Sequence, residues 1–245
     1  MNCTWAGSLC VVLLAASSVA CGQEASPEQP TSDKPTSPAD PAGLVRLSKT
    51  HDVWLDTKRK AVVIDGVVCL REGQLEMFAC PKGTKEHESI LALNCLPEEV
   101  HAGLLAAGAK PGTPVKFDPK YEPATGDIVD IVVLWRDADG GKHQARAQEW
   151  IKHAKTEKAM EYDWVFAGSG FWKDEETGKQ HYQANGGDFI CVSNFPTATL
   201  DLPVESSQAN SELLFHAFAE KIPPKGTKVR LVLIPRKKAA QKPKE

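Results

Sequence analysis

The chain has 245 residues, and its formal net charge of −3 is close to neutral. That length accommodates one large or two small domains, with enough apolar residues for a core. A near-neutral charge balance supplies no basic surface that would attract nucleic acid, so no nucleic-acid partner is expected.

The first segment of the chain indicates export. Residues 1–20 carry no charged side chain, and an apolar run from Leu9 to Ala16 ends in small residues. This run is too short to span a bilayer and is typical of the hydrophobic part of a secretory signal peptide. We therefore predict a signal peptide over residues 1–20.

The cleavage region Ser18-Val19-Ala20-Cys21 resembles a bacterial lipobox, whose cysteine is lipidated and becomes the new N-terminus. Ordinary signal peptidase could also cut after Ala20, and the protein would then be secreted. Lipidation of Cys21 is favoured because it leaves an even set of cysteines at 69, 80, 95 and 191. The expected location is the bacterial cell envelope, on the periplasmic side or at the outer membrane, with a lipid bilayer as partner of Cys21.

Residues 22–43 are rich in Pro, Ser, Thr and acidic side chains. Such a segment cannot bury enough apolar surface to offset the entropy of ordering it. With Cys21 it forms the expected tether, which would hold the domain roughly 25 Å or more from its anchor. Residues 236–245 are expected to be a basic, solvated tail, which leaves 44–235 as a single folded domain.

Most of this domain has the pattern of strands. Runs of β-branched and aromatic residues separated by short polar turns predict strands throughout. The expected strand regions are 53–70 (two strands around a turn at 56–59), 75–80, 127–137, 163–172, 179–185, 188–195, 213–219 and 227–235. Asp139-Gly140-Gly141 predicts a hairpin turn after the third of these regions.

Two helices are expected among the strands. Pro97 fits the first helical turn, Glu98 and Glu99 favour its positive end, and Gly108 can end the helix in a left-handed conformation. This predicts a helix over about 97–107, and apolar spacing from Ala147 to Ala154 predicts a second over about 145–155. With no regular strand–helix alternation, the predicted class is α+β with a mainly antiparallel or mixed sheet.

Several segments resemble the YdjY-type domain, an uncharacterised family common in exported and lipidated proteins of planctomycete-like bacteria. The resemblance rests on KGTKEHESIL at 82–91, LLAAGAKPGTP at 104–114, WVFAGSGFW at 164–172, ICVSNFP at 190–196 and the closing PPKGTKVRLVLIP. The resemblance covers about residues 43–235. It implies a folded domain of this type in an exported protein, and it implies no particular enzymatic reaction. Ferredoxin-like relatives carry clustered cysteines, which this chain lacks.

The segment CPKGTKEHESILALNC, from Cys80 to Cys95, contains residues suited to a metal site or a disulfide. Cys80, His87, Cys95 and His101 could supply zinc ligands, but none of them forms the close pair typical of structural zinc sites. No metal and no cofactor are therefore expected. A Cys80–Cys95 disulfide suits an exported protein and would contribute about 3 kcal/mol, although four cysteines allow three pairings. Cys69 and Cys191 lie in apolar strands and fit buried thiols.

Residues 168–173 come close to known catalytic and cofactor-binding motifs without matching them. Gly168-Ser169-Gly170 lacks the outer glycines of a nucleophile elbow, and Lys173 replaces the third glycine of a dinucleotide fingerprint. Lys85, His87 and Glu88 remain as candidates for acid–base chemistry or ligand contact, with a solvated lysine as the alternative. His101 is expected to be a partly buried packing residue.

Aromatic residues alternate along the strands near 164–182. Trp164, Phe166, Phe171, Trp172 and Tyr182, with nearby lysines, could line a groove for a glycan or nucleic acid, or could be core and cross-strand pairs. The preferred hypothesis is a lipid-anchored binding or structural module that contacts an envelope protein or small ligand. The alternatives are a hydrolase or transferase that uses Lys85, His87 and Glu88, and a redox or metal-binding protein.

Overall fold

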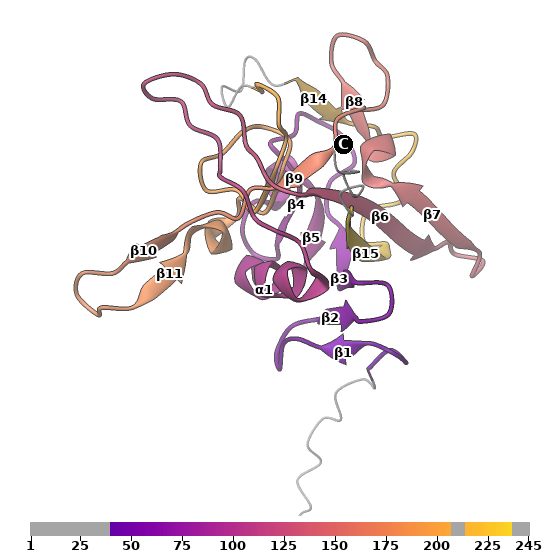
Figure 1. Cartoon of the computed structure of the whole chain (residues 1–245). Coiled ribbons are helices and arrows are strands. Elements are labelled where there is room, and N and C mark those ends of the chain that lie inside the picture. The colour runs from indigo at the N-terminus through magenta and orange to yellow at the C-terminus, as the bar shows by residue number, and fades with distance from the viewer. Residues whose placement is uncertain (1–39, 207–213, 237–245) are drawn as a thin grey trace, which may run out of the picture. The chain divides into compact units, whose positions relative to one another are not determined.

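A computed structural model describes residues 40–206 and 214–236 (Figure 1). The predicted signal peptide, Cys21, almost all of the tether and nearly all of the basic tail lie outside these residues. None of the helices in the described ranges is long and apolar enough to cross a membrane.

Eight strands close on themselves to form a β-barrel. In order around the barrel they are β3 (Ala61–Val68), β15 (Lys228–Pro235), β6 (Ile128–Arg136), β9 (Trp164–Phe166), β13 (Leu200–Asp201), β12 (Ile190–Cys191), β4 (Met77–Pro81) and β5 (Ser89–Leu93). The β5 strand pairs back onto β3, which completes the ring. Neighbouring strands are antiparallel except for the β4–β5 and β12–β13 pairs, which are parallel.

The remaining elements extend or cover this barrel. They are β1 (Val45–Arg46), β2 (Val53–Asp56), β7 (Lys142–Arg146), β8 (Ile151–His153), β10 (Phe171–Lys173), β11 (Gln180–Tyr182), β14 (Phe215–Ala217), α1 (Pro97–Ala107), and the 3₁₀ turns η1 (Glu86–Glu88), η2 (Ala147–Trp150) and η3 (Gln183–Gly186). Strands β1 and β2 extend the sheet from β3, and β7 extends it from β6. The β10–β11 hairpin projects from the barrel (Figure 1).

The barrel interior is filled by alternate residues of its long strands. Val133 of β6, Leu231 of β15 and Ile64 of β3 are direct cross-strand neighbours, and each is fully buried. This alternation follows from the period of two along a strand, which turns every second side chain inward. Truncating Leu231 to Ala would cost about 2–5 kcal/mol because the packed core would be left with a cavity.

Helix α1 packs against β2 and β3 on the outside of the barrel. A Cβ at Gly103 would lie 2.7 Å from Leu47 Cδ1 and 3.0 Å from Val62 Cγ2, so a glycine is what allows this close approach. Gly108 ends the helix with φ of 96° and donates its N–H to the Leu105 carbonyl across 2.9 Å. The helix predicted over 97–107 is confirmed in position and in its terminating residue.

Two sequence-based expectations are wrong. The α+β class is wrong because the protein is predominantly β, with a closed barrel and α1 as the one α-helix in the described ranges. The helix predicted over 145–155 is wrong because the segment is the end of β7, the single turn η2 and strand β8. Both apolar residues at the centre of this segment are buried, Trp150 at the end of the turn and Ile151 at the start of the strand.

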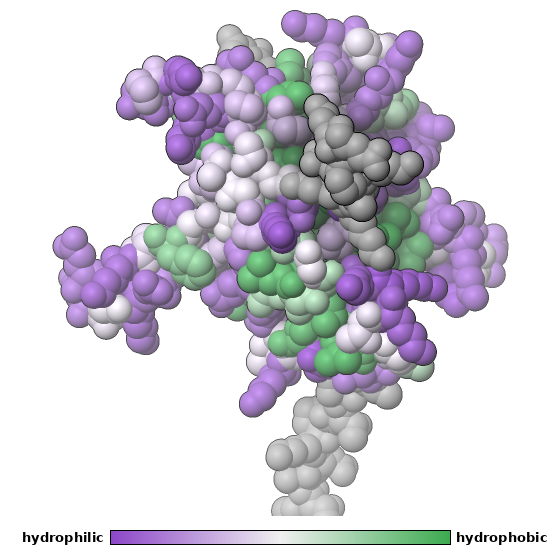
Figure 2. Space-filling model, viewed as in Figure 1, coloured by the Kyte–Doolittle hydropathy of each residue, from purple (hydrophilic) through white to green (hydrophobic). Residues whose placement is uncertain are grey.

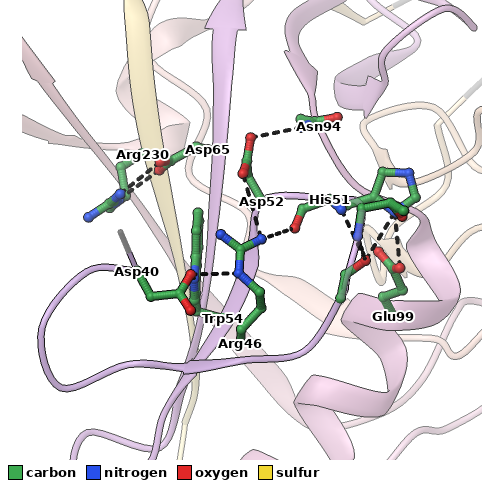
Figure 3. A network of polar contacts seen from close by, with 11 residues as sticks. Asp40, Arg46, His51, Asp52, Trp54, Asp65, Asn94, Glu99 and Arg230 are labelled. Carbon is green, nitrogen blue, oxygen red and sulfur yellow. Dashed lines mark hydrogen bonds and ion pairs between the residues drawn. The ribbon is translucent and has the colours of Figure 1, made fainter. Parts of the chain in front are cut away.

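A network of polar contacts connects Asp40 and Arg46 to Trp54 of β2 (Figure 3). Asp40 Oδ1 accepts hydrogen bonds from Arg46 Nε at 2.5 Å and from Trp54 Nε1 at 3.0 Å. The guanidinium carbons of Arg46 and Arg230 lie 4.9 and 5.5 Å from the centre of the Trp54 ring. Arg230 also binds Asp65 through two hydrogen bonds of 2.6 and 2.7 Å. The indole of Trp54 therefore joins residues that are far apart in the chain.

Candidate functional site

A cluster of charged side chains lies where β4, β5 and β12 run side by side. The Lys85 cluster consists of Glu76, Lys85, Glu88 and Asp188. Glu76 directly precedes β4, its N–H donates to the Glu88 carbonyl across 3.2 Å, and its carbonyl accepts the Val192 N–H across 2.8 Å. Because β4 pairs with both β5 and β12, the barrel brings these distant segments together.

Lys85 is the centre of the cluster. Its Nζ lies 2.9 Å from Asp188 Oδ1 and 3.5 Å from Glu88 Oε1. The same Nζ lies 4.6 Å from the centre of the Phe195 ring, within the range of a cation–π contact. The Lys85, Glu88 and Asp188 side chains are 27%, 19% and 17% exposed, so all three charges are partly withdrawn from water.

The lack of a side chain at Gly187 leaves space for the Lys85 side chain. A Cβ at this glycine would meet Lys85 Cγ at 2.7 Å and Cδ at 2.8 Å, and its φ of 135° also favours glycine. The aliphatic stem of the lysine lies against the glycine backbone before its ammonium group reaches the next residue, Asp188. Any larger residue at 187 would displace that stem.

Electrostatic effects in the cluster act in different directions. Burial works against the charged form of Lys85, but the hydrogen bond and charge of Asp188 outweigh it and raise the pKa of the lysine. Burial, together with the nearby charge of Glu88, raises the pKa of Glu76 above its ordinary value. Lys85 is therefore an ammonium group at neutral pH, and the Glu76 carboxyl group keeps its proton to a higher pH than an isolated glutamate does.

The structure brings together part of the predicted set. Lys85 and Glu88 form an ion pair, and His87 Nε2 lies 3.7 Å from Glu88 Oε2. The His87 side chain, however, is 76% exposed. Asp188 and Glu76 were missed by sequence reasoning because they lie far from Lys85 along the chain. The adjacent Gly186-Gly187 pair was the one local signal that a side chain from elsewhere packs there.

His101 belongs to a second cluster, made with Tyr182 of β11. Its Nδ1 lies 2.9 Å from the Tyr182 hydroxyl, which donates to the Gly168 carbonyl across 3.0 Å and lies 3.2 Å from Thr199 Oγ1. The imidazole also packs edge-on against Phe166 with ring centres 4.8 Å apart. Burial lowers the pKa of His101, so the ring is neutral at neutral pH. His101 is half-buried by these contacts, as its sequence position predicted.

Hydrogen bonds link the two clusters. The Thr197 hydroxyl donates to Asp188 Oδ2, and the Thr197 carbonyl accepts from Ser169 Oγ across 2.6 Å. Ser169 Oγ also accepts the Ala184 N–H across 3.2 Å. Ser169, with φ of 53°, thus has a structural role in positioning the loop before the β10–β11 hairpin. Segments that carried the family resemblance meet at this place in the fold.

The predicted aromatic set divides into core and surface residues. Trp164, Phe166 and Tyr182 are buried, whereas Phe171 is 60% and Trp172 is 49% exposed. Trp172 stacks on His181 of the opposite strand with ring centres 4.7 Å apart, and Phe171 lies 5.1 Å from the Tyr182 ring. Hydrophobic surface is visible at the base of the hairpin in Figure 2.

The four cysteines of the described ranges carry free thiols in this structure. Cys80, Cys95 and Cys191 are buried, and Cys69 is partly buried. Burial raises the pKa of Cys69 to about 12 and raises the pKa of the Cys80 thiol. The Cys80–Cys95 disulfide stays a prediction. Within 40–206 and 214–236, no group of three or more His, Cys, Asp or Glu side chains is arranged to hold a metal ion.

Comparison with known proteins gives one match. The model of a family described as the YdjY domain matches residues 53–234. Neither the curated proteins nor the solved structures contain a match to this chain. The matched range runs from the first residue of β2 almost to the end of β15, so it spans the whole barrel.

Proposed function

Because the chain belongs to the YdjY domain family, we propose that it is an extracytoplasmic binding module that contacts an envelope protein through the β10–β11 hairpin. A lipid on Cys21 would hold it at the membrane, and residues 22–43 would give the barrel reach. Support for export and anchoring comes from the uncharged apolar segment, the lipobox-like cysteine and the Pro- and Ser-rich stretch that follows.

One observation carries the choice of contact surface. The three residues of β10 are all exposed, and two of them are the large aromatic residues Phe171 and Trp172. Aromatic side chains are enriched at the energetic centres of protein interfaces, where they bury a large area at low entropic cost. On a hairpin held at its base by Tyr182, they are available to a partner without rearrangement of the barrel.

The contacts of Lys85 argue against a role as general base toward a bound substrate. A general base must be unprotonated at the working pH, whereas the contacts of Lys85 with Asp188 and Glu88 raise the pKa of the lysine. The His87 side chain is mostly in solvent, and its Nε2 lies 3.7 Å from Glu88 Oε2. Through its contact with Asp188, Lys85 connects the turn before β5 to the loop before β12.

Site-specific photo-crosslinking in intact cells tests the contact surface. Replacement of Trp172 by a photoreactive phenylalanine derivative should yield, on illumination, one discrete adduct with an envelope protein. The control carries the same group at Lys58, which is exposed in the turn between β2 and β3. An adduct from position 58 but none from position 172 would refute the proposed surface. A mass increase too small for a protein would point to the small-ligand alternative.

Anchoring is tested separately with Cys21→Ala. We expect the wild-type protein in the membrane fraction with a lipid-modified N-terminal cysteine in its mass spectrum. The variant should be released in soluble form. An unmodified Cys21 at the N-terminus of the mature wild-type chain would favour the secreted alternative, and it would leave the hairpin proposal unaffected.

A further inference from the structure

We propose that Lys85 and Asp188 become joined by an amide bond between their side chains, formed by the folded protein itself. The Lys85 Nζ lies 2.9 Å from Asp188 Oδ1. The residues are about one hundred positions apart in sequence, so only the completed barrel brings them together. The proposal is independent of the binding function of the hairpin.

The surroundings hold the reacting groups in place. Gly187 allows the lysine stem to lie against the backbone, and Phe195 covers the ammonium group at 4.6 Å. The Thr197 hydroxyl fixes the other carboxylate oxygen, Asp188 Oδ2. Groups held in contact in this way react with effective concentrations far above any attainable in solution, and this compensates for a slow bimolecular reaction.

Glu88 is placed to move the proton. Its Oε1 lies 3.5 Å from Lys85 Nζ and can accept a proton from the ammonium group, which leaves a neutral amine. The amine lone pair then attacks Cγ of Asp188. Negative charge develops on Oδ2, where the Thr197 hydroxyl donates a hydrogen bond to it.

The step balances within the cluster. The new bond joins Nζ to Cγ, and the bond from Cγ to Oδ1 breaks. Oδ1 leaves as water and takes the two protons that the lysine nitrogen loses, with Glu88 as carrier. One ammonium and one carboxylate become one neutral amide and one water molecule, so no oxidant or other reactant is required.

A cross-link at this position would tie the turn before β5 to the loop before β12. It would constrain the unfolded chain as a disulfide does, since it closes a long loop. The amide would thus supply covalent closure of the kind that exported domains commonly obtain from cystines.

Mass spectrometry of the purified mature protein tests the proposal. We expect an intact mass lower than the sequence mass by one water molecule, and a branched proteolytic peptide that joins Lys85 to Asp188. Lys85→Arg and Asp188→Ala should each restore the full mass. The matched control Lys82→Arg, an exposed lysine in the same turn, should keep the loss. Glu88→Gln should form the bond at least about tenfold more slowly, because it lacks the proton carrier.

Two results would overturn the proposal. One is a full sequence mass, with unmodified Lys85 and Asp188 peptides, after the folded wild-type protein has been incubated for several days at neutral pH. The other is a loss of one water molecule that survives in Lys85→Arg, since this would place the loss elsewhere, as in a succinimide formed at an aspartate followed by glycine. The primary measurement uses the wild-type chain, so it does not depend on the folding of any variant.

Discussion

The side-chain amide of Asn194 donates to the buried carboxyl group of Asp201 across 3.1 Å. The same carboxyl accepts the backbone N–H groups of Leu202 at 2.8 Å and Phe195 at 3.3 Å. Burial outweighs these hydrogen bonds and raises the pKa of Asp201 from 3.8 to about 7. The folded protein therefore holds a proton at a pH where the unfolded chain has lost it.

This relationship predicts a pH dependence of stability. The contribution of protonated Asp201 is complete below the unfolded pKa of 3.8 and is lost as the pH rises through the folded pKa of about 7. The loss is on the order of 4 kcal/mol in the free energy of unfolding. In Asp201→Asn this part of the slope should vanish in urea denaturation measured across that pH range. The exposed Asp139→Asn variant should keep the wild-type slope, and equal slopes in wild type and Asp201→Asn would contradict the assignment.

A second prediction concerns the glycine beside His101. Gly168 has φ of 90°, and a Cβ there would lie 2.8 Å from Pro111 Cβ, whereas Gly226 has φ of 87° and nothing within 4 Å. Gly226→Ala should cost about 1 kcal/mol through backbone strain alone. Gly168→Ala should cost about 1–3 kcal/mol more, because the methyl group also overlaps the proline. Chemical denaturation of both variants measures the difference in their free energies of unfolding. Equal decreases would contradict the prediction, because they would show that the loop moves away from the new methyl group without destabilising the fold.

The Tyr182 hydroxyl gives a third prediction. It is the shared partner of His101, Gly168 and Thr199 in the cluster at the base of the hairpin. Tyr182→Phe should lower the free energy of unfolding by about 1–3 kcal/mol, since buried polar groups lose a partner while the ring is retained. Tyr162→Phe serves as the control because Tyr162 is exposed and packs on Phe215 through its ring. A loss in the control as large as in Tyr182→Phe would argue against the hydroxyl as the cause.

Thiol reactivity provides a fourth prediction. Burial raises the pKa of the Cys95 and Cys191 thiols well above its ordinary value, and the thiolate is the reactive form. Iodoacetamide should therefore modify the native protein at least about tenfold more slowly than the protein in denaturant. The number of cysteines modified in denaturant without reductant separates two states. Among Cys69, Cys80, Cys95 and Cys191, modification of all four corresponds to the free thiols of this structure, and modification of Cys69 and Cys191 alone corresponds to the predicted Cys80–Cys95 disulfide.

Local sequence signals predicted most of the elements. The Val- and Ile-rich runs became β3, β6 and β15, and Asp139-Gly140-Gly141 turns β6 into β7 as expected. The proline, acidic and glycine signals around 97–108 placed α1 correctly. The error at 145–155 arose because a 3₁₀ turn followed by a buried strand repeats apolar residues at spacings that also suit a helix.

Barrel closure lay beyond these local signals. It depends on the pairing of β5 with β3 and of β15 with both β3 and β6, and no residue pattern within one strand specifies its partner. The same limit applies to the site. Lys85 and Glu88 stood out because they are close in sequence, but Asp188 and Glu76 join them only through the pairing of β4 with β5 and β12. The spacing of residues along one segment does not predict which distant residues strand pairing will bring together.

The position of β15 determines when the molecule can fold. This strand spans Lys228–Pro235 and lies between β3 and β6, so it pairs with a strand that precedes it by about 160 residues. Before β15 is synthesised, the chain lacks the strand that pairs with both β3 and β6. Loop-closure entropy disfavours other pairings between such distant segments. The barrel can therefore close only after β15 has been synthesised, although β3 is complete about 160 residues earlier.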